Sequence, residues 1–283
     1  MLRRLKQLWR VIVGTAKRFD DDNGGFLASA LAFDLLLCVL PFIIIIISVI
    51  GHLLESSQYA QQEIIKFFER VLPGSMEEVQ ENLGRFVRNR RIVGALGLAS
   101  LVFTASRVFS SIRFILKTVF RSKDDMHFVV GKLLDIGFVV FAGALALLSI
   151  GLSSFFTVWE EWGNNLLQNY GWNLEFLRNL VGYLIAYLVT ITMFFLLYRM
   201  PLLEAVPAKV VWIQAIVVGT LWEGAKMLFE LYLNSFNQYS IVYGSLGFLV
   251  ALILWFYYTA LIIVIGAELG STIHDLQHSR ARS

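Results

Sequence analysis

The sequence predicts an all-α polytopic membrane protein with about six membrane-spanning helices. Hydrophobic residues make up 57% of the 283 residues and charged residues only 16%, whereas a soluble domain carries roughly 25% charged residues. The mean hydropathy is +0.67. Apolar segments recur along the whole chain without a polar insert of domain size, so we expect a single membrane domain over residues 1–283. Open strands would leave backbone groups unpaired in lipid, which favours helices.

Crossing about 30 Å of hydrocarbon at 1.5 Å per residue requires roughly 20 apolar residues in a helix. The first, third and sixth of the stretches that meet this length are the most apolar, while the second and fifth contain charged residues. The six predicted spans are 26–52, 92–112, 133–158, 179–200, 208–233 and 243–267.

Basic residues set the predicted orientation. They gather before the first span, between the second and third, beside the loop after the fourth, and at the end of the chain. Because cytoplasmic loops are enriched in Lys and Arg, both termini are expected in the cytoplasm. Residues 53–91 disagree, since this segment is predicted to be external yet holds six basic residues, balanced by six acidic ones.

Three segments flank the predicted spans. Residues 1–25 place apolar side chains at helical spacing with basic residues between them, which predicts a cytoplasmic amphipathic helix at the membrane surface. Residues 53–91 predict two short external helices around Pro73 and Gly74. This helical pair has two open interpretations: a cover over the membrane domain, or a hairpin that only packs. Residues 268–283 are expected to form a cytoplasmic tail.

Charges inside the predicted spans are the candidates for a functional site, because each is costly in a membrane unless paired or hydrated. Asp34 precedes Pro41, which lacks an amide hydrogen and can kink or break the first span. Such a break can line a cavity in transporters. Alternatively, Asp34 lies near the cytoplasmic interface and Pro41 is a tolerated kink.

The fifth span carries Glu223, Lys226 and Glu230, whose spacing places them on one helix face. Lys226 can therefore pair with either acid, and the stripe is expected to face the bundle interior or water. The stripe forms either a polar cavity for a charged headgroup, an ion or a proton, or an ion-pair network that fixes helix packing. Arg107, in the second span, either binds a phosphate through its two-nitrogen fork or extends to the cytoplasmic headgroups.

The beginning and end of the sixth span contain small residues. Tyr243, Gly244 and Gly247 stand at its predicted entrance, where glycines permit tight turns and close helix approach. Gly266 and Glu268 close the span, with Glu268 expected near the cytoplasmic interface.

Catalytic and metal-binding patterns are absent from the sequence. The four histidines are dispersed, Cys38 is the single cysteine, and no zinc, P-loop, Rossmann or G-x-S-x-G motif occurs. We therefore expect no enzyme, no cofactor and no metal site. The basic residues flank apolar segments rather than forming a soluble groove, so nucleic acid is not an expected partner.

Several longer motifs make the chain similar to a known family. The sequence resembles the YihY/BrkB family of bacterial inner-membrane proteins, some of them formerly labelled ribonuclease BN. In that family a tyrosine usually follows the Ala-Leu-Ala run, whereas this chain has Phe33, which puts a hydroxyl role there in doubt. The resemblance runs over nearly the whole chain and rests on Phe19-Asp20-Asp21-Asp22-Asn23, Ala28-Ser29-Ala30-Leu31-Ala32-Phe33, Leu40-Pro41, Phe120-Arg121-Ser122-Lys123, Glu223-Gly224-Ala225-Lys226, Tyr232, Tyr243-Gly244-Ser245-Leu246-Gly247, Trp255-Phe256-Tyr257 and Gly266-Ala267-Glu268.

The resemblance implies a six-span protein of the bacterial inner membrane, with some relatives linked to serum resistance and to traffic of envelope lipids. Our leading hypothesis is a transporter or flippase-like protein for an anionic lipid or lipid precursor. Lys226 and Arg107 would contact its headgroup, and Glu223, Glu230 and Asp34 would balance charge or couple to protons. The alternatives are a non-transporting scaffold for envelope assembly and, third, an intramembrane enzyme.

Overall fold

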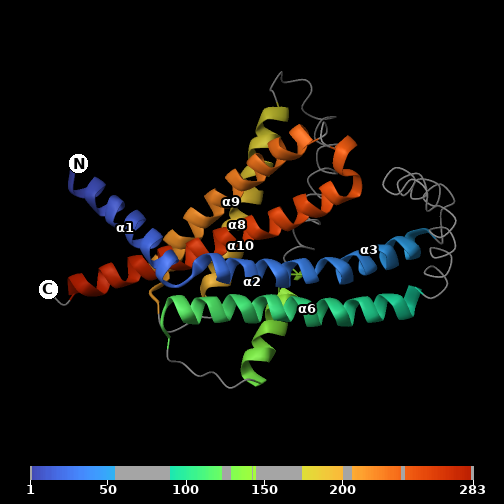
Figure 1. Cartoon of the computed structure of the whole chain (residues 1–283), viewed down its shortest axis with the longest axis horizontal. Helices are drawn as coiled ribbons and strands as arrows, with labels where there is room; N and C mark the ends of the chain where they lie inside the picture. The colour runs from blue at the N-terminus through green and yellow to red at the C-terminus, as the bar shows by residue number, and fades with distance from the viewer. Residues whose placement is uncertain are drawn as a thin grey trace.

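The computed structural model describes residues 2–54, 90–122, 129–141, 143–144, 174–199, 206–236 and 240–281. Regular structure in these ranges is helical throughout, which confirms the all-α prediction (Figure 1). Residues 129–141 form a further helical segment. The labelled helices are α1 (Leu2–Asp21), α2 (Gly24–Leu37), α3 (Val39–Leu54), α6 (Arg90–Val119), α8 (Leu174–Arg199), α9 (Ala208–Phe236) and α10 (Ser240–Ala281).

Four helical stretches of the described residues are long and apolar enough to cross a membrane. They correspond to the first, second, fourth and sixth predicted spans. The fifth predicted span forms α9 but does not join this group, since its charged residues lower its hydropathy. The third begins in the helical segment 129–141, and most of it lies outside the described residues. The four stretches are Gly24–Ile46, Gly94–Val119, Gly182–Arg199 and Leu249–Gln277.

The first span is broken ahead of Pro41, as the chemistry of proline predicts. Cys38 forms a turn between α2 and α3, and Pro41 is the third residue of α3. Pro41 has no amide hydrogen to donate to the carbonyl of Leu37, but this loss is tolerated in the first turn of a helix. The chain therefore passes from α2 to α3 with both helices lying alongside α6 (Figure 1).

The N-terminal helix forms as the sequence predicts, whereas the C-terminal helix is longer than predicted. The amphipathic segment at the N-terminus forms α1, as predicted. By contrast, α10 runs without interruption from Ser240 to Ala281, so Tyr243, Gly244 and Gly247 lie inside a helix and the predicted tail from residue 268 is helical. The predicted external helical pair at 53–91 lies almost entirely outside the described residues.

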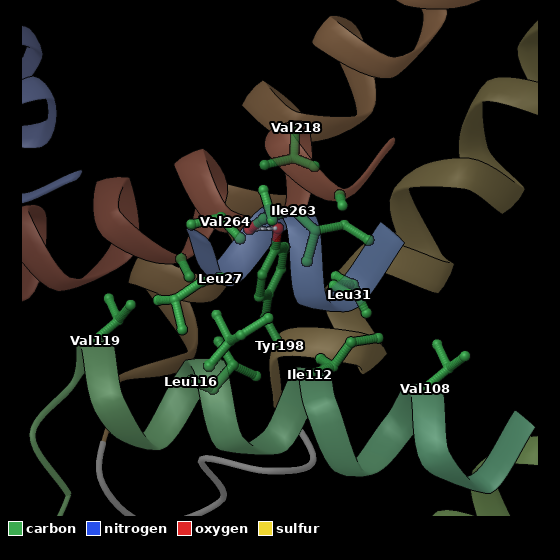
Figure 2. Close-up of a cluster of buried hydrophobic side chains, with 14 of the residues drawn as sticks. Leu27, Leu31, Val108, Ile112, Leu116, Val119, Tyr198, Val218, Ile263 and Val264 are labelled. Atoms are coloured by element: carbon green, nitrogen blue, oxygen red, sulfur yellow. Dashed lines mark hydrogen bonds between the residues drawn. The ribbon is translucent and has the colours of Figure 1, made fainter. Parts of the chain in front are cut away.

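The core is built where α2, α6, α8, α9 and α10 meet around Tyr198 (Figure 2). The buried phenol of Tyr198 donates a hydrogen bond of 2.9 Å to the carbonyl of Ile263. A methyl group at position 266 would overlap both Tyr198 Oη and Val218 Cγ2. Gly266 is therefore required for α10 to approach α8 and α9 this closely, which explains a glycine in mid-helix. From α6, the buried side chains that face this centre are Val108, Ile112, Leu116 and Val119.

Candidate functional site

Asp34 of α2 and Arg107 of α6 form an ion pair between two candidate spans. The Nε of Arg107 donates to Asp34 Oδ1 at 3.2 Å, and the hydroxyl of Ser111 donates to Asp34 Oδ2. The carboxylate side is buried, with 7% of the Asp34 side chain exposed, whereas 54% of the Arg107 side chain is exposed. The structure thus brings together two charges that the sequence placed in separate spans without linking them.

Arg107 lies on an exposed apolar face of α6. Leu96, Phe103 and Phe114 share this face at helical spacing, and each is more than 60% exposed. Arg107 also sits near the middle of the candidate span Gly94–Val119. Either end of that span is roughly 18 Å away at 1.5 Å per residue, a distance that one side chain cannot bridge. This position disfavours the interpretation in which Arg107 extends to the headgroup region.

The two Nη nitrogens of Arg107 are not used in the ion pair with Asp34. Among the described residues, Arg107 donates only through Nε, so neither Nη nitrogen has a bonded partner there. Lys132 adds a second cation nearby, with its Nζ 6.0 Å from the ring centroid of Phe103, one helical turn before Arg107. We call Phe103, Arg107 and Lys132 the α6 cationic surface. An arginine fork beside a second cation suits an anion with several oxygens, such as a phosphate.

A second ion pair on α6 was missed from the sequence. Arg113 Nη2 lies 3.0 Å from Asp135 Oδ2, and Ser110 donates to the same oxygen at 2.6 Å. Arg113 also donates to the carbonyl of Gly131. Both partners are largely buried, and Asp135 is bonded from two sides, so this pair ties α6 to the segment 129–141. The available signal was an acidic residue within the third predicted span.

The charges of α9 form a separate group. Lys226 Nζ lies 2.8 Å from Glu223 Oε1, and Thr190 of α8 donates to that same oxygen at 3.3 Å. Lys226 and Glu230 are exposed, so the stripe runs along the surface of α9 instead of facing the core. Within the described part of the chain, no hydrogen bond or ion pair links this group to Arg107. The one polar cavity that the sequence suggested corresponds to two charged sites in the structure.

The burial of Glu268 is a feature that the sequence did not predict. The sequence put it near the cytoplasmic interface, which stays a prediction, and its side chain is completely buried within the candidate span Leu249–Gln277. Both of its carboxylate oxygens lack a hydrogen-bond partner. α10 continues past Gly266, and α1, α2, α6 and α9 all pack against α10. Across the described ranges, no cluster of three or more His, Cys, Asp or Glu side chains could hold a metal ion.

Four apolar candidate spans, with an ion pair between two of them, define a polytopic helical membrane protein. The family model described as Virulence factor BrkB matches residues 15–283. The chain therefore belongs to the BrkB/YihY (UPF0761) family of membrane proteins. No solved structure matches the chain.

Relatives of the same family match along almost their entire length. A UPF0761 membrane protein of Cronobacter sakazakii is 28% identical over 99% of this chain and 91% of the relative. The UPF0761 membrane protein YihY of Salmonella typhimurium is 27% identical over 96% of this chain and 88% of the relative. A UPF0761 membrane protein of Psychromonas ingrahamii is 24% identical over 96% of this chain and 90% of the relative.

Proposed function

We propose that this protein moves an anionic lipid, or an anionic envelope lipid precursor, in the bacterial inner membrane, with both termini in the cytoplasm. One observation carries the proposal: the half-exposed guanidinium of Arg107 in the middle of a candidate span, with two nitrogens free of bonds to described residues. A charged residue within a spanning helix often marks a substrate or ion pathway. The apolar face around Arg107 offers a surface for acyl chains.

Binding a headgroup at this place has a clear physical basis. Asp34 holds Nε and thereby restrains the guanidinium, and neither Nη nitrogen is bonded to a described residue. Two parallel hydrogen bonds to a phosphate would then form without further ordering of the side chain. The acyl chains would lie against Leu96, Phe103 and Phe114.

The α9 group supplies a second contact for the same substrate. Lys226 would meet the headgroup at another stage of its movement, with Glu223 and Glu230 balancing charge. The partners in this proposal are membrane lipids, and it involves no cofactor and no catalytic step. A scaffold role is the second candidate, favoured by the closed and buried Arg113–Asp135 pair, which only holds helices together.

Transbilayer movement of a fluorescent anionic lipid in proteoliposomes tests the proposal, with a zwitterionic lipid of the same chains as the comparison. The wild-type protein should make the transbilayer movement of the anionic lipid faster than it is in protein-free vesicles. Arg107→Gln should slow that movement by about 10-fold or more, because a charge-assisted hydrogen bond contributes roughly 1.5–3 kcal/mol. Lys209→Gln, which removes an exposed base at the start of α9, is the matched control and should match the wild type. Equal movement with and without protein would exclude transport and leave the scaffold.

A further inference from the structure

A carboxylate without partners is buried in the last helix. Glu268 is 0% exposed, and neither of its carboxylate oxygens has a hydrogen-bond partner. An isolated ionised carboxylate is very unfavourable in a protein interior, so such groups are normally paired, protonated or bound to a cation. The lipid site proposed above does not use Glu268, which therefore needs a role of its own.

A second acidic oxygen faces the same place from the junction of α1 and α2. Asp22 follows the end of α1, where its backbone N–H donates to the carbonyl of Arg18 at 2.8 Å. Asn23 then takes a left-handed conformation with φ 53°, which turns the chain directly into α2. This turn sets the Asp22 carboxylate close enough to Glu268 for the two to repel each other, and Asp22 Oδ2 is also buried without a partner.

Two buried threonine hydroxyls lie at the adjoining contact between α1 and α10. Thr272 lies one helical turn after Glu268, on the same face of α10. Its methyl carbon would be 3.0 Å from a side chain at Gly14, and Thr15 is the next residue of α1. Thr15 and Thr272 are each more than nine-tenths buried, and neither hydroxyl has a hydrogen-bond partner. The contact between α1 and α10 thus contains unpartnered oxygens on both helices.

The surrounding charges compensate Glu268 only from a distance. Arg18 of α1 and Arg121, which follows α6, act electrostatically on Glu268 and neither bonds to it. Arg18 instead donates to Ser271 and Asp275 of α10. Arg121 has φ 50° in the closing turn of α6, which fixes it near this site. The remaining titratable group on this part of α10 is His274, while α9 presents the uncharged Gln214 to Gly270 on the other side of α10.

We propose that Glu268 and Asp22, with the hydroxyls of Thr15 and Thr272, bind a monovalent cation, either H⁺ or Na⁺. Every unpartnered atom of this group is an oxygen, the ligand that hard cations prefer. A proton or a sodium ion between the two carboxylates would relieve their repulsion. Two nearby arginines and only two carboxylates leave too little negative charge for a divalent ion. The site lies near the end of the bundle where both termini emerge (Figure 1).

The site also joins three sequence motifs that the lipid site leaves unexplained. Asp22 belongs to the Asp20-Asp21-Asp22-Asn23 segment, Arg121 to Phe120-Arg121-Ser122-Lys123, and Glu268 to Gly266-Ala267-Glu268. These segments are distant in the sequence and meet at one position in the fold. A cation site at this position would account for all three segments.

Two measurements on the purified full-length protein test this inference. The first is the midpoint of thermal unfolding in NaCl against N-methylglucamine chloride at equal ionic strength, because an ion that binds the folded state raises this midpoint. The second is the infrared carbonyl band of a protonated carboxylic acid, followed from about pH 5 to about pH 9. The variants are Glu268→Gln and Asp22→Asn, and Asp21→Asn at the exposed neighbouring position is the matched control.

A sodium-dependent rise of the midpoint in the wild type and in Asp21→Asn, lost in Glu268→Gln and Asp22→Asn, would establish Na⁺. A titrating carboxylic band that Glu268→Gln removes, without a sodium effect, would establish H⁺. The inference is overturned if the folded wild type shows neither response. If Glu268→Gln does not fold, the same two measurements on the wild type and Asp22→Asn test the inference. These readouts measure ion binding without lipid movement, so this inference and the proposed function can fail separately.

Discussion

The Nε of Arg107 donates to the buried Asp34 carboxylate at 3.2 Å, which ties the middle of α6 to α2 while the rest of the guanidinium stays outside the packed core. This pair solves a problem that every charge in a membrane poses, because an unpaired arginine there is costly. One nitrogen is used for structure and two remain for recognition.

The Asp34–Arg107 pair should contribute modestly to stability. A double-mutant cycle of Asp34→Asn and Arg107→Gln is expected to give a coupling energy of about 1 kcal/mol, since the arginine is more than half exposed. Denaturant titration in detergent gives the free energy of unfolding for the wild type, the two single variants and the double variant, which are the four values of the cycle. A coupling energy near zero would mean that the contact is not formed in solution.

Breaking the Arg113–Asp135 pair should be far more damaging. Arg113→Gln leaves the Asp135 carboxylate buried with only Ser110 as a partner, and removing one partner of a buried pair costs about 3–5 kcal/mol. We expect Arg113→Gln to lower the free energy of unfolding by that amount, or to prevent folding. Stability close to that of the wild type would show that Asp135 is hydrated.

Position 266 should tolerate no side chain. Gly266→Ala places a methyl group against Tyr198 and Val218, and overpacking of a core typically costs about 1–3 kcal/mol. Gly224→Ala in α9 is the matched control, because nothing lies within 4 Å of its new methyl group, and alanine there should stabilise by up to about 1 kcal/mol. Thermal unfolding of both variants would reveal the contrast, and equal effects would contradict the close approach of α10 to Tyr198.

Lys226 should matter for function more than for stability. Its pair with Glu223 is partly exposed, and pairs of this kind contribute about 0–1 kcal/mol. Lys226→Ala should therefore unfold almost like the wild type and yet move anionic lipid several-fold more slowly in proteoliposomes. A variant that is unstable but moves lipid normally when folded would assign Lys226 to packing.

The class of fold could be predicted from the sequence, and so could the helices that depend on the apolar or amphipathic pattern of neighbouring residues. Apolar length predicted the four candidate spans, and amphipathic spacing predicted α1, because both depend only on neighbouring residues. The break before Pro41 also follows from covalent chemistry. The bounds of α10 could not be predicted, because Gly266 and Gly270 look like helix ends until Tyr198 and Gln214 are seen packed against them.

The partners of the charged residues required tertiary structure. Asp34, Arg107 and Lys226 were recognisable as candidates because a charge in an apolar run is unusual. The pairing of Lys226 with Glu223 was predicted from their spacing, but the pairing of Asp34 with Arg107 was not, since these two residues lie 73 residues apart in the chain. The burial of Glu268 was not predicted because it depends on helices distant in the sequence, and Asp135 was overlooked for the same reason.

The most direct test of the central claim is the affinity of the purified protein for phosphatidylglycerol in detergent, measured for the wild type, Arg107→Gln and Arg107→Lys. If Arg107 binds the headgroup through its fork, Arg107→Gln should weaken binding by about 10- to 100-fold, and Arg107→Lys should restore only part of the affinity. Affinities equal to the wild type in a folded Arg107→Gln variant would contradict the assignment of Arg107 as the headgroup contact.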